Sequence, residues 1–243
     1  MKELVKAIEL STGYGEGKKQ RIVGENLNAA LLSGELTALI GPNGAGKSTL
    51  MRTLSGFQAP CGGKIEIMGR DISDLKRSEL AKMVSVVLTE KPSLDNMKVE
   101  ELVELGRSPY TGFFGRAGIE DKEMVESAIA QVGIESLRDR YVSSLSDGER
   151  QKVMIAKALA QSTPVIFLDE PSAFLDWPSK AELFRLLRRL AQAENKAILL
   201  STHDLEIAFR LSDRFWIMDR EKQLTVSKEP PYYIIGEVGA ERE

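Results

Sequence analysis

The chain has 243 residues, of which 42% are hydrophobic and 28% charged, and its formal net charge is −3. This length and composition are typical of one large globular domain, or of a domain with an inserted lobe, and the mild acidity argues against nucleic acid as a partner. The single cysteine, Cys61, excludes an internal disulfide and indicates a reducing compartment. We find no signal-peptide core and no run of about 18 apolar residues, so we expect no segment that spans a bilayer alone.

Short apolar runs bounded by turn residues predict the strands of a sheet. They occupy Leu36–Ile40, Val84–Leu88, Val165–Leu168, Ala197–Leu200 and Phe215–Met218. Ile65 and Ile67 alternate with polar neighbours and predict a further, half-exposed strand. Apolar residues with a period near 3.6 predict a helix over Ala181–Ala191, with Pro178 placed to begin it. Strands that alternate with helices predict an α/β fold with a largely parallel sheet covered on both faces.

The middle of the chain has helical patterns and no convincing strand. The patterns cover Val99–Arg107, Asp121–Val132 and Gly148–Ala160. We therefore expect a helical lobe over about residues 91–153, inserted into a core formed by about residues 1–90 and 154–225. Residues 226–243 contain Pro230 and Pro231 and end in charged residues, which predicts a short C-terminal appendage.

The segment that follows the strand Leu36–Ile40 has the pattern of a phosphate loop. It consists of Gly41, Pro42, Asn43, Gly44, Ala45, Gly46, Lys47, Ser48 and Thr49, and it opens a helix predicted to continue through Leu50, Leu54 and Phe57. Backbone N–H groups of such a loop surround phosphates, and the helix N-terminus adds positive potential. Lys47 would contact the β- and γ-phosphates, and the Ser48 hydroxyl is a hard ligand for Mg²⁺. The loop alone does not distinguish a kinase, a GTPase and an ATPase.

Two carboxylates end the strand Val165–Leu168. Because side chains alternate along a strand, Asp169 and Glu170 point in different directions and can do different work. Asp169 would approach Mg²⁺ or its bound water, and Glu170 would polarise an attacking water as general base. The only histidine, His203, follows the strand Ala197–Leu200, and a neighbouring parallel strand would place it near the γ-phosphate. A lone histidine is more often structural or on the surface, and the position of His203 after an apolar strand weakens that interpretation only somewhat.

A helix start lies within Leu145–Gln151. Ser146 and Glu149 have the spacing of a capping box, and the free N–H groups there form an anion site with the Ser146 hydroxyl and Gly148. An ordinary helix start explains the same residues.

Taken together, these segments resemble the motifs of the ABC-transporter ATPases. The phosphate loop and residues 145–151, 165–171, 172–176 and 201–204 occur in that family's order, and the resemblance covers about Leu4 to Thr225. It implies a P-loop NTPase (RecA-like) core with an N-terminal antiparallel β subdomain and an inserted helical subdomain. Residues 1–225 would then form one ABC ATPase domain that hydrolyses ATP with Mg²⁺.

The resemblance also implies roles for residues on both sides of a dimer. Ser146, Asp147, Gly148 and Glu149 correspond to the family's signature motif, in which Ser146 and Gly148 would contact ATP bound to a second chain arranged head to tail. Asp176 would lie in the loop that crosses the dimer interface, the D-loop.

Within one chain, the resemblance assigns the remaining site residues. Tyr14 would stack on adenine, and His203 corresponds to the family's switch histidine. Lys47, Glu170 and His203 are therefore the expected catalytic residues, and Ser48 and Asp169 are the expected ligands of Mg²⁺.

Three positions depart from the family pattern. Thr89 stands at the Q-loop position, where a glutamine usually contacts Mg²⁺, and threonine would need a bridging water to do so. Asp147 and Glu149 replace the common glycine and glutamine of the signature. Because Asp147 adds negative charge near a γ-phosphate, we expect it to point away or to pair with Arg150, and we expect weaker closure of the dimer.

The segment Val99–Tyr110, with its run Gly106-Arg107-Ser108-Pro109-Tyr110, resembles importer subunits for iron–siderophore complexes, haem and cobalamin. This implies a peripheral motor at the cytoplasmic face of the inner (plasma) membrane, bound to a polytopic permease and indirectly served by a substrate-binding protein. Two alternatives remain. One is a soluble ABC-type ATPase acting on DNA or ribosomes, which the missing coiled-coil insertion and basic surface disfavour. The other is a regulatory ATPase without catalysis, which the intact acidic and basic site residues disfavour.

Overall fold

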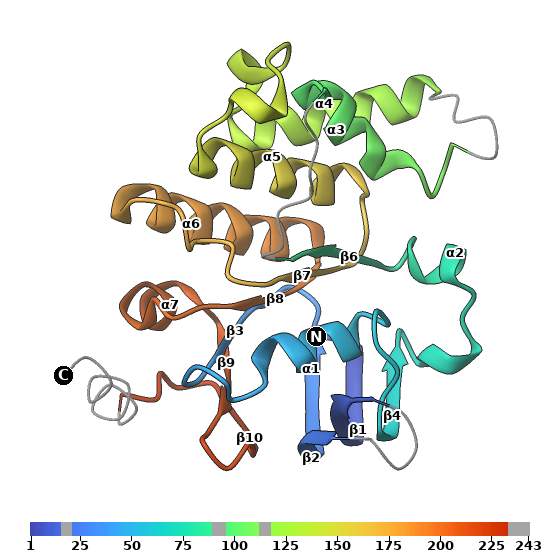
Figure 1. The fold of residues 1–243 in the computed structure, drawn as a ribbon, viewed down its shortest axis with the longest axis vertical. Helices are drawn as coiled ribbons and strands as arrows, with labels where there is room; N and C mark the ends of the chain where they lie inside the picture. Colours follow the sequence, from blue (N-terminus) through green and yellow to red (C-terminus); the bar gives the residue numbers. More distant parts are fainter. Residues whose placement is uncertain (16–20, 89–95, 112–117, 233–243) are drawn as a thin grey trace.

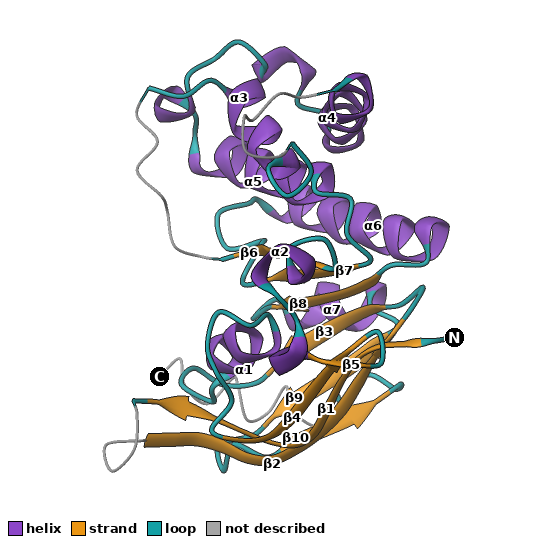
Figure 2. Cartoon of the chain, turned by 90° about the vertical axis from the view of Figure 1, so that its right-hand side faces the viewer, coloured by secondary structure: helices purple, strands orange, loops and turns teal. Residues whose placement is uncertain are grey.

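The computed structural model of the chain describes residues 1–15, 21–88, 96–111 and 118–232 (Figure 1). Within these ranges the chain forms a four-stranded sheet and a six-stranded sheet. A group of helices lies beyond the larger sheet, on the side away from the smaller one (Figures 1 and 2).

The larger sheet has the strand order β10-β9-β3-β8-β7-β6. Its strands are β3 (Leu36–Ile40), β6 (Val84–Val87), β7 (Val165–Leu168), β8 (Ala197–Ser201), β9 (Arg214–Met218) and β10 (Leu224–Ser227). All neighbours pair in parallel except β10, which pairs antiparallel with β9. The predicted α/β class and the five predicted strands are confirmed. The sequence did not predict β10, and since β10 ends at Ser227, the expected appendage at residue 226 begins inside a strand.

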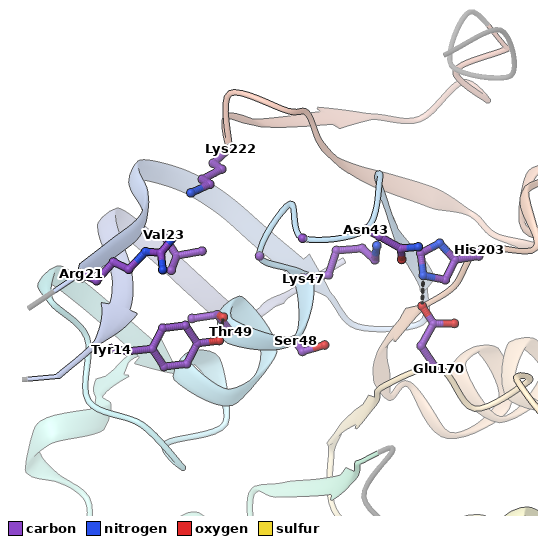
Figure 3. Close-up of a pocket in the computed structure, with 12 residues that line it drawn as sticks. Tyr14, Arg21, Val23, Asn43, Lys47, Ser48, Thr49, Glu170, His203 and Lys222 are labelled. Atoms are coloured by element: carbon purple, nitrogen blue, oxygen red, sulfur yellow. Dashed lines mark hydrogen bonds and ion pairs between the residues drawn. The ribbon is translucent and has the colours of Figure 1, made fainter. Parts of the chain in front are cut away.

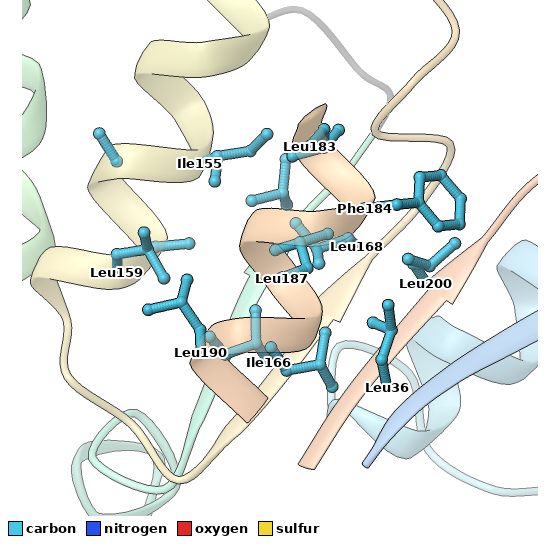
Figure 4. Packing of buried hydrophobic residues seen from close by; sticks show 14 of the residues in the cluster. Leu36, Ile155, Leu159, Ile166, Leu168, Leu183, Phe184, Leu187, Leu190 and Leu200 are labelled. Carbon is cyan, nitrogen blue, oxygen red and sulfur yellow. The ribbon is translucent and has the colours of Figure 1, made fainter. Parts of the chain in front are cut away.

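Both faces of the central strands β3, β7 and β8 are covered, and every residue of these strands is buried. Along β7, Ile166 and Leu168 belong to a core shared with α5 and α6, whereas Val165 and Phe167 belong to a core shared with α1 and the smaller sheet. Figure 4 shows residues of the first core between the sheet and the two helices. Each such leucine or isoleucine contributes about 1.5–3 kcal/mol by leaving water, so the continuous apolar runs explain the central position of these strands.

The smaller sheet is antiparallel, with the order β2-β1-β4-β5. Its strands are β1 (Glu3–Tyr14), β2 (Arg21–Leu32), β4 (Gly62–Ile67) and β5 (Arg70–Asp71). Ile65 and Ile67 on β4 are buried, and the polar residues between them are not, as the alternation predicted. The helix α1 (Lys47–Leu54) packs against β1. The expected continuation to Phe57 is wrong, because α1 ends at Leu54 and the Phe57 side chain is 64% exposed.

The remaining helices form the lobe, one cover of the larger sheet, and a single turn that packs on the core shared with the smaller sheet. They are α2 (Arg77–Leu80), α3 (Val99–Glu104), α4 (Ile119–Val132), α5 (Asp147–Ala160), α6 (Trp177–Glu194) and α7 (Leu205–Leu211). α3 and α4 pack on α5, which also touches β6 (Figure 2). Between Met97 and Ala160, the described residues contain an isolated bridge, Lys98 to Tyr141, and no strand. The proposed boundary at residues 153 and 154 falls inside α5, so lobe and core share this helix.

Gly106 and Arg107 join the parts of the lobe. A Cβ on Gly106 would lie 2.3 Å from the Lys157 carbonyl oxygen, so only glycine permits this approach to α5. The buried Arg107 guanidinium donates to Asp121 Oδ1 at 2.9 Å on α4 and to the Ala160 carbonyl at 2.8 Å on α5. It also lies 4.1 Å from the centre of the Tyr110 ring. The run that resembles importer subunits therefore has a packing function in this chain.

Candidate nucleotide-binding and hydrolysis site

The phosphate loop connects β3 to α1, and its glycines adopt conformations that other residues disfavour. Gly41, Gly44 and Gly46 have φ values of 153°, 76° and 104°. A Cβ on Gly41 would lie 2.2 Å from the Met218 carbonyl oxygen. One on Gly46 would lie 2.7 Å from a Val23 methyl group. The loop is therefore wedged between β9 and β2, and its shape depends on both sheets.

A cavity of about 430 Å³ opens in front of this loop (Figure 3). Its lining consists of Tyr14, Arg21, Val23, Asn43, Gly44, Gly46, Lys47, Ser48, Thr49, Glu170, His203 and Lys222. The smaller sheet supplies one end, the loop supplies the floor, and the segments after β7 and β8 supply the other end. A cavity of this size suits a small ligand, and nine of its lining residues were predicted from the sequence. The predicted loop residues Gly41, Pro42 and Ala45 do not line it, and neither does Asp169.

Lys47 is the first residue of α1 and is almost completely buried. Its ammonium group donates to the carbonyl oxygens of Gly41 at 2.7 Å and Pro42 at 3.1 Å. The lysine is thus held over the loop at the helix N-terminus, where positive potential favours an anion. Ser48, the next residue, is exposed to the cavity.

The two carboxylates after β7 have different surroundings, as the strand alternation predicted. Asp169 is buried, and its Oδ1 accepts a hydrogen bond from the Ser201 hydroxyl at 2.6 Å. The same hydroxyl accepts from the Glu170 backbone N–H at 2.8 Å. Glu170 itself has a left-handed backbone with φ of 50°. Ser201, at the end of the neighbouring strand β8, therefore holds the Asp169 carboxylate and the Glu170 backbone.

Glu170 and His203 meet at the edge of the cavity (Figure 3). Their atoms Oε1 and Nε2 lie 2.9 Å apart. Although Glu170 Oε1 is buried, no described residue donates to it with the alignment of a hydrogen bond. An acceptor oxygen of this kind, close to an imidazole and aimed at the space before a phosphate loop, can hold and polarise a water molecule.

The residues present fit an Mg²⁺ ion that is shared with a nucleotide. Ser48 offers an accessible hydroxyl at the cavity wall, and the Asp169 carboxylate lies at the end of β7. Within the described ranges, no group of three histidine, cysteine or acidic residues forms a metal site by itself. Mg²⁺ commonly takes one or two protein oxygens and completes its shell with phosphates and water, which is the arrangement these residues allow.

The signature residues do not line this cavity. Ser146 caps α5, and the predicted capping box is present. Glu149 Oε2 accepts from the Ser146 N–H at 2.8 Å and from its hydroxyl at 2.9 Å, while Oε1 accepts from Arg140 at 3.0 Å. These contacts, chiefly the Ser146 N–H, hold the pKa of Glu149 below its ordinary value. The expected pairing of Asp147 with Arg150 stays a prediction, and Arg150 donates to the Val142 carbonyl at 3.3 Å.

Two other predicted residues also lie away from the cavity or outside the described ranges. Asp176 is the N-cap of α6, and its Oδ1 accepts from the Ser179 N–H at 3.0 Å. Hydrogen bonds from Ser179 lower the pKa of Asp176. Thr89, at the Q-loop position, lies outside the described residues.

Sequence reasoning missed several residues that shape the site. Arg21 pairs directly across from Tyr14 on β1 and β2, and Lys222 lies in the turn between β9 and β10. Both line the cavity near Tyr14, whose hydroxyl contacts Thr49 (Figure 3). A prediction of the pairing register between β1 and β2 would have placed Arg21 beside Tyr14. Ser201 belongs to the predicted segment 201–204, but its contact with Asp169 depends on the pairing of β7 with β8. Nothing local in the sequence marks Lys222.

The fold and the site define a P-loop nucleotide-binding domain with an inserted helical lobe. The family model described as ABC transporter matches residues 24–173. The chain therefore belongs to the ABC transporter family, as one of its ATP-binding, ATP-hydrolysing subunits.

Individual relatives match this chain over most of their length. An uncharacterised ABC transporter ATP-binding protein of Methanocaldococcus jannaschii is 43% identical over 219 residues, which cover 90% of this chain and 74% of that protein. The iron(3+)-hydroxamate import ATP-binding protein of Bacillus subtilis is 36% identical over 221 residues, which cover 91% of this chain and 80% of that protein. The dimeric structure of a bacterial ABC transporter cassette has a TM-score of 0.81 at 26% identity, covering 92% of this chain and 98% of that chain.

Proposed function

We propose that the chain hydrolyses ATP with Mg²⁺ to power an ABC importer for an iron–siderophore complex, haem or cobalamin. The observation that carries the hydrolytic part is the pair Glu170 and His203, which meets 2.9 Å apart in a cavity shared with the phosphate loop. The importer part is supported by the likeness to the iron(3+)-hydroxamate import protein and by the run Gly106–Tyr110.

ATP would lie along the cavity, with its triphosphate on the loop and its base on Tyr14. Lys47 would exchange its contacts with loop carbonyls for oxygens of the β- and γ-phosphates. Glu170 would direct a water molecule in line with the γ-phosphate, and His203 would donate a hydrogen bond to the charge that develops there. Ser48 and Asp169 would hold Mg²⁺, which neutralises phosphate charge when bound.

A second copy of the chain would complete the site. Ser146 and Gly148 lie outside the cavity of their own chain, which supports a contact with nucleotide bound to the partner. Two large aromatic side chains beside Asp176 are exposed, Phe174 in the preceding loop at 43% and Trp177 at the start of α6 at 55%. Exposed aromatic residues of this kind are favoured at protein interfaces. The similar cassette of known structure is dimeric, which supports a head-to-tail dimer here.

A groove of about 410 Å³ between core and lobe is the proposed docking surface for the permease. It is lined by Ser55, Gly56, Phe57, Arg77, Leu80, Ala81, Val84, Val86, Lys157, Ala158 and Gln161. The residues that line it include four aliphatic or aromatic side chains besides two alanines, and the cations Arg77 and Lys157 without a carboxylate among the same residues. Partial burial lowers the pKa of Lys157 because it disfavours the ammonium form, and a carboxylate that reached Lys157 would offset this cost by pairing with the charge. We expect a helical segment of the permease with an acidic residue in this groove.

The location of the protein follows from that contact. No helix within the described residues is long and apolar enough to cross a membrane. The chain would sit at the cytoplasmic face of the inner (plasma) membrane through the permease. A substrate-binding protein would contact the permease rather than this chain, and no nucleic acid is expected as a partner.

Capture of partners tests the function directly. Glu170→Gln keeps the side-chain size and removes the base, so the ATP-bound form should persist. Affinity purification of this variant with ATP from detergent-solubilised membranes, followed by mass spectrometry, should recover a polytopic membrane protein in stoichiometric amount. Glu206→Gln on the exposed face of α7 is the matched control. Recovery of ribosomal or DNA-repair proteins alone would support a soluble ABC-type ATPase instead.

A charge reversal in the groove separates docking from hydrolysis. The Lys157→Glu variant should no longer co-purify with the membrane protein, while ATP hydrolysis by the purified chain continues. If the wild-type protein hydrolyses no ATP at all, the regulatory alternative is correct and the motor function is wrong.

A further inference from the structure

Asp204 links the two loops that carry the proposed catalytic residues. Its Oδ2 accepts a hydrogen bond from the Ser172 hydroxyl, two residues beyond Glu170, at 2.8 Å. Its Oδ1 accepts from the Lys180 ammonium on α6, also at 2.8 Å. Ser172 is completely buried, and the side chains of Lys180 and Asp204 are 19% and 28% exposed. The residue directly after His203 is therefore bound to the segment directly after Glu170.

The conformation of Asp204 shows that this link replaces a local contact. Asp204 is the N-cap of α7, a position at which an aspartate usually accepts from the backbone of its own helix. No such hydrogen bond is formed here, because both carboxylate oxygens are directed at Ser172 and Lys180. Lys180 in turn belongs to the first turns of α6, and its N–H donates to the Asp176 carbonyl at 2.9 Å. The carboxylate thus joins the His203 loop to the whole segment from Glu170 to α6.

We propose that Asp204 and Lys180 are positioning residues for ATP hydrolysis, which hold His203 and Glu170 on the same side of the γ-phosphate. The inference rests on the proposed hydrolytic function. Neither residue lines the cavity, so neither touches nucleotide. Their effect is exerted through the 2.9 Å approach of His203 to Glu170, which depends on where two separate loops lie (Figure 3). A small misplacement of reacting groups is sufficient to slow a reaction strongly.

The same helix offers a matched control. Arg188 lies about two turns after Lys180 on α6 and pairs with Asp213 at 2.7 Å, with side chains 39% and 17% exposed. Asp213 Oδ2 also accepts from the Leu36 N–H, at the beginning of β3. Leu36 begins the strand whose opposite end leads into the phosphate loop, so this pair lies at the edge of the sheet away from the cavity. Arg188→Met and Lys180→Met each break one half-buried ion pair between α6 and the core.

Steady-state kinetics on the full chain give the first measurement. Lys180→Met should lower kcat by about tenfold or more with the KM for ATP within about twofold of wild type, because binding groups are untouched. Lys180→Arg should restore most of kcat, and Arg188→Met should leave it unchanged. Equal losses of kcat in the two methionine variants would overturn the inference, as would an effect of Lys180→Met on KM alone.

The single histidine of the chain gives a second measurement that needs no activity. In protein labelled with ¹⁵N-histidine, one set of imidazole resonances reports the surroundings of His203. Lys180→Met and Ser172→Ala should shift these resonances, and Arg188→Met should not. Unchanged resonances in Lys180→Met overturn the inference even if activity falls. If the wild-type protein lacks ATPase activity, the proposed function fails and the resonances still decide whether Lys180 positions His203.

Discussion

The two halves of the ATP site differ in how complete they are within one chain. In the first half, the phosphate loop and the ends of β7 and β8 converge on one cavity, where Lys47, Glu170 and His203 meet. In the second half, the N-terminus of α5 lies outside that cavity, and Ser146 is bound to Glu149 of its own chain. The binding half is thus preformed by strand ends that share a sheet edge. The signature half is bound within its own chain, and in the proposed dimer it would contact the nucleotide of the partner.

The largest expected effect comes from breaking the preformed half. Lys47→Ala removes the cation held over the loop, so ATP hydrolysis should fall by roughly 10³, equivalent to about 4 kcal/mol of barrier. Steady-state ATPase assays and equilibrium binding of ATP check this outcome. Lys122→Ala, at an exposed position of α4, is the control. An unchanged rate in Lys47→Ala would remove the loop from catalysis.

Mixing two inactive variants tests whether the halves belong to different chains. Lys47→Ala lacks the loop cation but keeps its signature, and Ser146→Ala has the reverse defect. In a head-to-tail dimer of one copy of each, one site is intact, so an equal mixture should recover up to about a quarter of the wild-type rate. A mixture of Lys47→Ala with the double variant should recover nothing. The absence of recovery in the first mixture as well would place the signature in the site of its own chain.

Substitutions at the end of the cavity where Tyr14 would bind adenine should have a moderate effect. Arg21 and Lys222 face the cavity near Tyr14, and within the described residues neither forms an ion pair. Two cations that face one cavity favour an anionic ligand, so Arg21→Ala and Lys222→Ala should each raise the KM for ATP about three- to tenfold with kcat unchanged. Lys6→Ala, eight residues before Tyr14 on β1, is the control. A drop in kcat without a change in KM would argue against a binding role.

The smallest expected effect concerns the signature half and its pH dependence. Because hydrogen bonds from Ser146 lower the pKa of Glu149 in the folded chain, their stabilisation is present above the unfolded pKa of about 4.3 and disappears as pH falls through the folded value. Glu149→Gln should therefore lower the free energy of unfolding at pH 7 by less than about 1 kcal/mol for this solvent-accessible contact, and Tm slightly with it; the difference should vanish once pH has fallen below the lowered folded pKa. Thermal unfolding at several pH values checks this. A difference that persists in acid would show that charge is irrelevant to the capping box.

Removing the charge of Glu149 should also loosen Ser146 for its role in the partner's site. The same variant should require less ATP for half-maximal hydrolysis, because one negative charge near the proposed γ-phosphate contact is gone. Asp147→Gly tests the neighbouring charge in the same assay. An unchanged ATP dependence in Asp147→Gly would contradict the expected weakening of dimer closure by that residue.

The sequence by itself determined the features that depend on neighbours in the chain. The phosphate loop needs only nine consecutive residues, the capping box needs Ser146 and Glu149 three positions apart, and the buried strands need only continuous apolar runs. These elements appear in the structure with their ends within about one residue. The motif order then placed the chain in its family.

Tertiary structure alone decided what depends on strands far apart in the sequence. It brought Ser201 to Asp169, Asp204 to Lys180, and Lys222 to the cavity beside Arg21. It also ended α1 before Phe57 and added β10 to the sheet edge. No local pattern encodes these contacts, because each is set by the order of strands in the sheet and by the register of their pairing, which bring together side chains separated by tens of residues or more.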